Sequence, residues 1–389
     1  MSSPSNSLPV AKRSRASRIR AFWARVTEGF ELEQLWGQFL SEAKASYGLY
    51  SADVDWDEIK RESRGARRVF RSAWALFQAM LMKLSPARRV LLLIAVALLI
   101  FQPDIQTGSH HVSVNFGVFG TMILFLLLAL ELADRVTMKR DLEIAREIQQ
   151  WLVPDKAPAV PGFDISFATR PQNTVAGDYY DAFLRPLPDA SGTQPLLVIV
   201  ADVAGKSVPA ALLMATFQAS LKALSSTSEP LEAVVSGLDR YARAHSLDGR
   251  RFTTAFLAEI DPQTRQMRYT NAGHNDPILR RASGQIERLR AGGPPFGLPL
   301  FSDSEVPYES AAVQLQPGDL LFIFTDGLVE AVDERGEEFG ESRLIPSLQT
   351  AALESAAGTL QRVMADVNAF VGYARQHDDI TCLVLRVNA

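Results

Sequence analysis

Four aspartate motifs lie beside the ends of apolar runs in the C-terminal part of the chain, and their residue types suit metal chemistry. The motifs are the segments 175–181, 202–205, 324–327 and 377–381, which contain Asp178, Asp202, Asp326 and the pair Asp378–Asp379. One Asp-Gly pair alone is common in turns, but four motifs at strand ends can bring their carboxylates together. Clustered carboxylate oxygens suit hard cations such as magnesium and manganese. Two such ions about 3.5–4 Å apart can activate a bridging water and clamp a phosphoryl group for in-line attack.

The segment around Asp202 carries the clearest local signal. The apolar run Leu196–Val200 is typical of a buried strand, Gly205 can turn the chain, and Pro209 suits the first turn of a helix. A carboxylate at the end of a buried strand is held rigidly and is partly desolvated, which favours a catalytic or metal-binding role. The alternative is an aspartate that only caps the helix or the turn.

The pattern from Phe163 onward predicts many short strands and a few helices. Strands are expected at 163–169, 196–203, 252–260, 266–271, 277–281, 286–290, 312–315, 320–325 and 380–387, and helices near 208–224, 230–245, 341–350 and 355–372. Because the strands follow one another through turns and the helices come in pairs, we predict an antiparallel, layered α+β domain over residues 155–389.

The order of the motifs resembles that of a known family. The quoted segments are Asp178–Asp181, Asp202–Gly205, Asn271–His274, Gly293–Leu298, Thr325–Glu330 and Asp378–Thr381. Together they resemble the SpoIIE/RsbU-like serine phosphatases, bacterial members of the metal-dependent PPM superfamily. The segment Ala145–Pro154 also resembles the helix that precedes their catalytic domain. The resemblance covers about residues 140–388 and does not extend to residues 1–130.

The resemblance implies a fold, a cofactor and a ligand set. The family fold is a β-sandwich flanked by helix pairs, with two divalent cations, manganese or magnesium, at one end. Water activated by these ions attacks the phosphorus of phosphoserine or phosphothreonine, without a protein nucleophile. The implied metal ligands, whose carboxylates also form the catalytic site, are Asp178, Asp202 (bridging both ions), Asp326 and Asp378, with the Val203 carbonyl as a further ligand and Asp379 as the competing choice at the last position.

Two positions depart from the family pattern. Ala176 and Ser207 stand where glycines are common, but neither replaces an expected ligand. His274 is a conceivable acid–base residue, although we interpret Asn271–His274 as a structural turn. Asp181 either binds a metal through water or holds a strand.

Charge and composition narrow the classes of function. The first 90 residues carry 16 Lys and Arg against nine Asp and Glu, whereas the whole chain of 389 residues has a net charge of −4. The acidic excess therefore lies in the C-terminal part, which argues against a nucleic-acid substrate. The basic front favours a membrane surface. A single cysteine, Cys382, excludes a disulfide framework, and the polar first residues do not resemble a signal peptide.

Two apolar runs predict a transmembrane hairpin over residues 86–131. Val90–Phe101 is short for a membrane span, and Val112–Leu130 is long enough. Lys and Arg flank the pair outside but are absent from the connecting segment Gln102–His111. The positive-inside rule then gives a multi-pass protein of the cytoplasmic (inner) membrane, with both termini in the cytoplasm. A buried helical hairpin is the alternative.

The hairpin is expected to connect two cytoplasmic parts. Residues 1–85 are basic, with helices expected over Arg18–Tyr47 and Asp57–Leu84. Residues 132–154 form a linker helix with one apolar stripe, Met138, Leu142, Ala145, Ile148 and Leu152. This helix is a candidate lever or homodimer contact, or else it only packs on its own domain.

These features together predict a membrane-anchored phosphoserine/phosphothreonine protein phosphatase. By resemblance, its partner is a phosphorylated regulatory protein such as an anti-sigma factor antagonist with a STAS fold, in partner-switching signal transduction that controls a sigma factor. A catalytically silent docking module of the same fold is the alternative. A nuclease with two metals is a weaker one.

Overall fold

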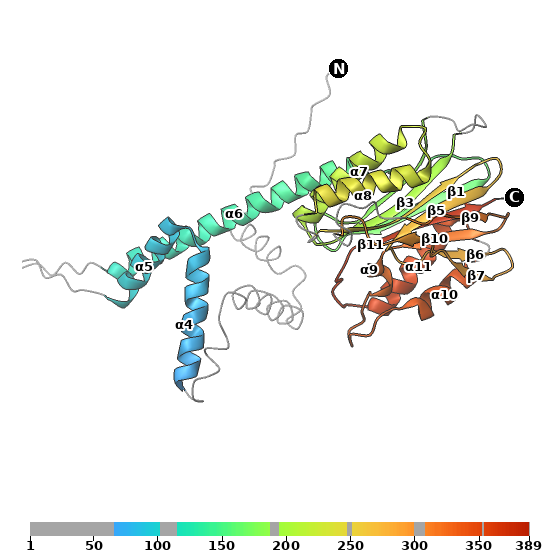
Figure 1. Cartoon of the computed structure of the whole chain (residues 1–389). Helices are drawn as coiled ribbons and strands as arrows, with labels where there is room; N and C mark the ends of the chain where they lie inside the picture. Colours follow the sequence, from blue (N-terminus) through green and yellow to red (C-terminus); the bar gives the residue numbers. More distant parts are fainter. Residues whose placement is uncertain are drawn as a thin grey trace, which may run out of the picture. The chain divides into compact units, whose positions relative to one another are not determined.

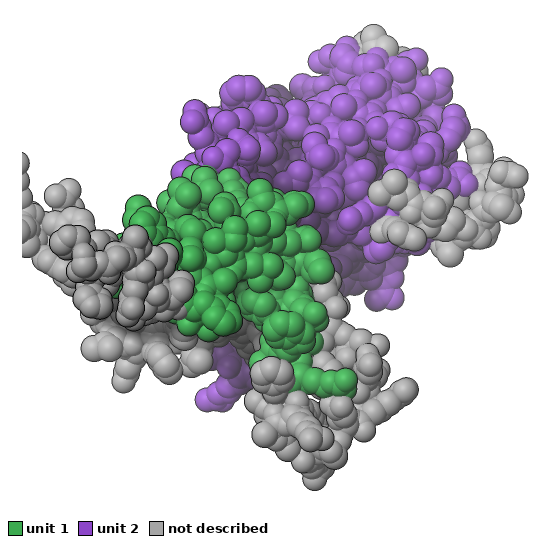
Figure 2. Space-filling view, turned by 90° about the vertical axis from the view of Figure 1, so that its left-hand side faces the viewer, with its two compact units in different colours: residues 1–134 green, residues 135–389 purple. Residues whose placement is uncertain are grey.

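The computed structural model describes residues 66–101, 115–186, 194–246, 251–298, 308–351 and 354–388. The chain divides into two compact units, Met1–Asp134 and Arg135–Ala389, which Figure 2 shows in green and purple. The helix expected over Arg18–Tyr47 and the connecting segment Gln102–His111 lie outside the described residues, as does the first part of the helix expected over Asp57–Leu84.

The first unit contains helices α4 (Ala66–Lys83) and α5 (Pro86–Ile100) and the start of α6 (Phe116–Leu152). Helices α5 and α6 touch where Gly120 faces Ala95: a Cβ at Gly120 would lie 2.9 Å from the Ala95 carbonyl oxygen. Arg88 of α5 pairs with Glu131 (3.4 Å) and Asp134 (2.7 Å) of α6. These contacts pair α5 with the start of α6.

Helix α6 has the length and composition of a membrane span. Within the described ranges, two helices are long and apolar enough to cross a bilayer, α6 and α7 (Val208–Ser225). Helix α7 packs against a sheet through Met214, Phe217 and Leu221, as a core helix does. By contrast, α6 exposes large apolar side chains such as Phe119 and Phe125. Helix α5 has only 15 residues, which is short for a span.

The second unit is a sandwich of two antiparallel sheets, apart from one short parallel pair (Figure 1). One sheet has the order β1-β11-β10-β6-β7, formed by Phe163–Arg170, Ile380–Val387, Leu320–Phe324, Ile278–Arg280 and Ile286–Arg288. The other has the order β2-β3-β4-β5-β8, with β9 also paired to β5, formed by Tyr179–Leu184, Leu196–Val203, Thr253–Ile260, Gln266–Ala272, Gly292–Gly293 and Ala311–Gln314.

Helices cover both outer faces of the sandwich (Figure 1). Helices α7 and α8 (Leu231–Ala244) pack on the β3-β4 face, while α10 (Glu341–Thr350) and α11 (Ala356–Val371) pack on the β10-β11 face. A third apolar core fills the space between the sheets, where side chains such as Val198, Phe256 and Leu383 are fully buried. This alternation of layers follows from strands with two apolar faces, one turned to the opposite sheet and one to a helix pair.

The predicted layered α+β architecture is confirmed, with small differences. The expected strands and helices occur with bounds that shift by one or two residues. Three elements were not predicted: strand β2, the two-residue strand β8 and the single-turn helix α9 (Asp326–Val329). Helix α6 runs without a break from the apolar run through the expected linker to Leu152.

Candidate metal centre

The four aspartate motifs converge at one end of the sandwich. Asp178 directly precedes β2, Asp202 lies near the end of β3, Asp326 begins α9 after β10, and Asp378 and Asp379 precede β11. Strands β2 and β3 belong to one sheet, and β10 and β11 belong to the other. One sheet therefore supplies two of the five carboxylates and the other supplies three.

Hydrogen bonds join the motifs across the two sheets. Thr325, at the end of β10, donates its hydroxyl to Asp178 Oδ2 (3.0 Å). The backbone N–H groups of Gln172 and Gly177 donate to Asp379 Oδ1 (2.6 Å) and Oδ2 (2.7 Å). The loop before β2 is thus tied to the start of β11.

The carboxylates are buried close enough to repel one another. Burial, the neighbouring Asp202 and Asp379 hold the pKa of Asp178 well above its usual range, although Thr325 and Thr381 oppose this. Burial and repulsion from Asp326, Asp378 and Asp379 raise the pKa of Asp202 to about 7. Such groups are costly as bare anions, and a cation among them relieves the repulsion.

The pKa values of Asp326 and Asp379 are also raised. Burial, with Asp378 nearby, raises the pKa of Asp326, and burial likewise raises the pKa of Asp379 against its two backbone N–H donors. Crowded, oxygen-only carboxylates of this kind fit divalent magnesium or manganese. Within the described ranges, however, no three acidic, histidine or cysteine side chains are already arranged to hold an ion.

Asp378 and Asp379 have different surroundings. Both oxygens of Asp379 accept backbone hydrogen bonds from the loop before β2. Asp378 instead lines an open pocket and pairs with Lys206 at 3.0 Å. The geometry favours Asp378 over Asp379 as a ligand, because a metal can take the place of Lys206 without breaking the loop.

The Val203 carbonyl lies beside the loop that precedes β2. A Cβ at Gly177 would lie 3.1 Å from Val203 O, so this oxygen is adjacent to the loop that presents Asp178. The backbone around Gly177 cannot carry a larger side chain without moving one of these groups. The carbonyl is therefore a suitable additional oxygen donor.

Asp181 and His274, which the sequence analysis considered as metal-binding or acid–base residues, have structural roles. The buried Asp181 accepts hydrogen bonds from Tyr179 (2.8 Å) and Lys222 of α7 (2.7 Å), so it holds β2 to a helix. Asn271 closes the turn to His274 by accepting from its N–H (2.7 Å) and donating to its carbonyl (3.0 Å). Burial lowers the pKa of His274 to about 4, which keeps it neutral. The structure agrees with the interpretation of this segment as a turn.

Ser207 occupies a backbone conformation that favours glycine. Its φ is 65° and its ψ is −149°, a region that side chains with a Cβ rarely enter. Ser207 directly precedes α7 and follows Lys206. The departure from the family pattern at this position therefore places a strained residue beside the site.

No role was assigned to Lys206, Thr325 or Gln149 from the sequence alone. Gln149, near the end of α6, donates to the carbonyl of Ala176 (2.7 Å) and accepts from its N–H (3.0 Å). This double hydrogen bond ties α6 to the loop that carries Gly177 and Asp178. The signal for such a pairing is weak, because a glutamine in a polar helix is ordinary.

We expect Gln149→Leu to loosen that loop and lower activity. The variant keeps the size of the side chain but removes both hydrogen bonds to Ala176, each of which contributes about 1 kcal/mol. A fall of about fivefold to tenfold in turnover at limiting metal, recovered in part at saturating metal, is the expected result. Gln150→Leu on the same helix is the control. Equal metal dependence in both variants would contradict the coupling.

Comparisons with known proteins agree with this architecture. The second unit resembles the SiaA-PP2C domain of Pseudomonas aeruginosa, with a TM-score of 0.57 and 22% identity over 66% of this chain and 99% of that domain. The fold is therefore that of PP2C-type phosphatase domains. The family model for stage II sporulation protein E (SpoIIE) matches residues 192–388, and the chain belongs to this family.

Two curated relatives extend the similarity. The chain is 26% identical to Protein IcfG of Synechocystis over 327 residues, which are 76% of this chain and 49% of IcfG. It is 28% identical to the phosphoserine phosphatase RsbU of Bacillus subtilis over 253 residues, which are 64% of this chain and 70% of RsbU. The chain thus spans about half the length of the first relative.

Proposed function

We propose that this chain is a metal-dependent protein phosphatase that hydrolyses phosphoserine or phosphothreonine on a regulatory partner protein. The observation that carries the proposal is the convergence of carboxylates from both sheets at one end of a PP2C-type sandwich. Membership of the SpoIIE family, whose domains are PPM-type phosphatases that use divalent metals, supports the reaction class.

The proposed ligands of two divalent cations, magnesium or manganese, are the oxygens gathered at this end. The carboxylates of Asp178, Asp202, Asp326 and Asp378 and the carbonyl of Val203 would hold the ions, and Asp202 would serve as a ligand shared by both. When bound, the ions supply a water nucleophile at neutral pH and neutralise the phosphoryl charge.

The surrounding residues position these ligands. Thr325 holds Asp178, and Asp379 holds the loop before β2. Lys206 neutralises Asp378 until a cation does so. Cys382, the single cysteine of the chain, is fully buried, and burial raises the pKa of its thiol, so it is unsuited to act as a nucleophile.

Metal affinity should increase with pH up to about pH 7. Asp202 must lose its proton before it can bind a cation, and its pKa is raised to about 7. Below that pH, the dissociation constant for manganese should rise by at least about tenfold for each unit by which the pH falls, because Asp178 must also lose its proton. Isothermal titration of the full-length chain between about pH 5.5 and pH 8 measures it. An affinity independent of pH would contradict the assignment.

The same pKa shift sets the stability of the metal-free protein. A folded-state pKa above the unfolded value means that the folded chain holds a proton that the unfolded chain releases. Asp202 therefore contributes a loss of stability to the metal-free protein as pH rises from about 4 to about 7, and added manganese should remove this contribution.

The silent docking module is the second candidate, favoured by the lack of a finished metal site among the described side chains. The same titration separates the two functions. Uptake of two manganese ions supports the phosphatase. No uptake at about pH 8 would support a docking module.

We also propose that the protein is anchored in the cytoplasmic membrane, with its catalytic domain in the cytoplasm. The apolar exposed surface of α6 and its contact with α5 support a two-pass hairpin over residues 86–131. Residues 1–85 then form a basic cytoplasmic region, and 155–389 the phosphatase domain. The partner is a phosphorylated protein, in keeping with the RsbU relative, and we propose a STAS-type anti-sigma factor antagonist in partner-switching signalling.

Residues 132–154 are proposed to act as a signalling helix and homodimer contact. Ile144, Ile148 and Trp151 are exposed apolar side chains at i, i+4 and i+7, so they share one face of this part of α6. A soluble surface rarely presents such a row, and a second copy of the helix can cover it. Gln149 then connects the helix to the metal loop.

A further inference from the structure

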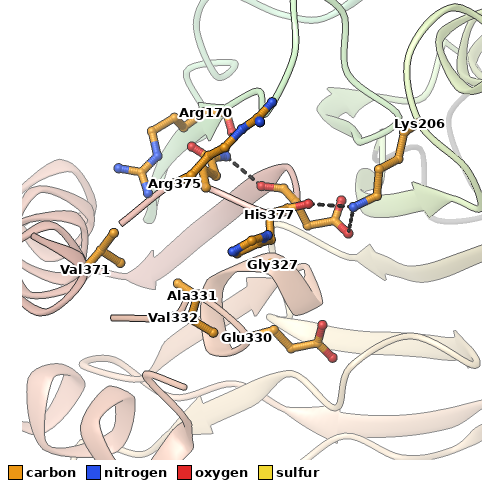
Figure 3. Close-up of a pocket in the computed structure, with 11 residues that line it drawn as sticks. Arg170, Lys206, Gly327, Glu330, Ala331, Val332, Val371, Arg375 and His377 are labelled. Atoms are coloured by element: carbon orange, nitrogen blue, oxygen red, sulfur yellow. Dashed lines mark hydrogen bonds and ion pairs between the residues drawn. The ribbon is translucent and has the colours of Figure 1, made fainter. Parts of the chain in front are cut away.

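A pocket of about 200 Å³ is lined in part by Asp378 (Figure 3). Its walls come from the end of β1, the turn after β3, the segment after α9 and the segment between α11 and β11. The lining residues used below are Arg170, Lys206, Val332, Val371, Arg375 and Asp378. Arg170, Arg375, Val332 and Val371 have no role in the metal site described above.

The pocket has a cationic end. Arg170 and Arg375 lie at the same end of it, with Lys206 across the pocket on the other side of His377 (Figure 3). Two carboxylates, Glu330 and Asp378, also line the pocket. Asp378 is a proposed metal ligand, so a bound cation would balance its negative charge. The other charged lining residues, Arg170, Lys206, Arg375 and Glu330, have a net positive charge.

Arg170 and Arg375 differ in their hydrogen-bond and ion-pair partners. Arg170 donates to Asn368, but its Nε is buried without a partner among the described residues. Arg375 is exposed and has no hydrogen-bond or ion-pair partner in the described part of the chain. Lys206, by contrast, is held by Asp378 and by the His377 carbonyl (2.5 Å). The arginine end is therefore the part of the pocket with unused donors.

The segment that carries Arg375 is anchored, so its position is defined. Gln376 donates to the carbonyls of Arg170 (2.7 Å) and Asp378 (2.6 Å). These bonds fix the distance of the arginine end from the proposed metal ligand. An anion bound there would lie at a constant offset from the reacting phosphate.

The remaining lining is apolar. Val371 and Val332 lie at the lower side of the pocket, together with Ala331 (Figure 3). An aspartate or glutamate side chain has both parts that this lining needs, methylenes for the apolar side and a carboxylate for the guanidinium groups.

We propose that this pocket binds an acidic side chain of the phosphoprotein substrate, adjacent in its chain to the phosphoserine, and that Arg375 is the specificity-determining residue. The inference rests on the proposed phosphatase function. Arg375 does not touch the reacting phosphate; it selects the segment that carries it. Charge-assisted hydrogen bonds from one guanidinium can change kcat/KM by about tenfold.

Charge reversal in enzyme and substrate tests the proposal. Full-length protein with manganese is assayed on phosphoserine peptides that carry a single Glu, or a single Lys, at each position flanking the phosphoserine. The wild type should prefer Glu at one position by about tenfold in kcat/KM. Arg375→Glu should lose that preference and favour Lys at the same position, while its turnover of p-nitrophenyl phosphate stays unchanged. Arg268→Glu, on β5 of the other sheet, should behave as the wild type.

Two results would overturn the proposal. One is the same peptide profile for Arg375→Glu and the wild type; the other is an equal loss of p-nitrophenyl phosphate turnover, which would show damage to the metal centre. Peptide binding followed by fluorescence anisotropy needs no turnover. Charge-dependent binding that Arg375→Glu reverses, in a wild type without turnover, would therefore support the pocket and contradict the proposed phosphatase.

Discussion

Asp202→Asn is expected to abolish metal-dependent phosphatase activity while the protein stays folded. The substitution removes the carboxylate proposed to lie between the two ions, at unchanged size. We expect turnover of a phosphoserine peptide to fall by about a thousandfold or more, which corresponds to ~4 kcal/mol of lost transition-state stabilisation. Phosphate release by the full-length protein at saturating manganese measures the effect.

The same variant should make the metal-free protein more stable. Burial and three neighbouring carboxylates disfavour the charged form of Asp202, and asparagine has no charge to repel them. Thermal unfolding at about pH 8 should therefore show a higher midpoint without metal and a smaller rise on adding manganese. Asp276→Asn, outside the carboxylate group, is the control. A variant with full activity would remove Asp202 from the site.

Gly327→Ala is expected to destabilise the phosphatase unit strongly. A Cβ at Gly327 would lie 2.0 Å from the carbonyl oxygen of Asp379 and 3.2 Å from Cβ of Asp378. One methyl group would therefore push the start of α9 away from the segment that precedes β11. We expect a loss of about 3 kcal/mol in the free energy of unfolding, together with most of the activity, because Asp326 and Asp378 would be separated.

Gly336→Ala is the matched control for this prediction. Gly336 has a φ of 82° but nothing within 4 Å of an added Cβ, so only the backbone preference is lost. That cost is about 1–2 kcal/mol. Chemical denaturation of the two variants compares them directly. Equal destabilisation would show that the close approach at Gly327 does not matter.

The places of the site aspartates in the fold were predictable because they lie in local motifs. Asp202 and Asp326 each follow an apolar run that is typical of a buried strand, so their place near a strand end could be predicted from the sequence. The helices on both faces were equally predictable, since their apolar residues repeat at helical spacing. Strand ends and helices depend mainly on residues that are close in sequence, so they could be predicted from the sequence.

The contacts between distant segments were not predictable in this way. Strand β2 begins at two tyrosines and includes a buried Asp181, whose charge looks unsuited to a strand until Lys222 of α7 is seen beside it. Gln149 and Arg375 are polar residues on exposed segments, and nothing nearby in the sequence indicates their partner or pocket. Their roles depend on which segments the fold brings together.

The choice between Asp378 and Asp379 shows the same limit. Two adjacent aspartates carry the same chemistry in sequence, and only the backbone N–H groups of Gln172 and Gly177 distinguish them. Asp379 anchors the loop before β2, whereas Asp378 pairs with Lys206, and we propose Asp378 as the ligand.

The most direct measurement is phosphate release from a phosphoserine peptide by the purified full-length chain, with manganese or magnesium and with a chelator. The account predicts turnover that requires a divalent cation, disappears with the chelator and returns when the metal is restored. Absence of turnover with both metals, from a folded protein that binds neither, would contradict the assignment of a dimetal phosphatase.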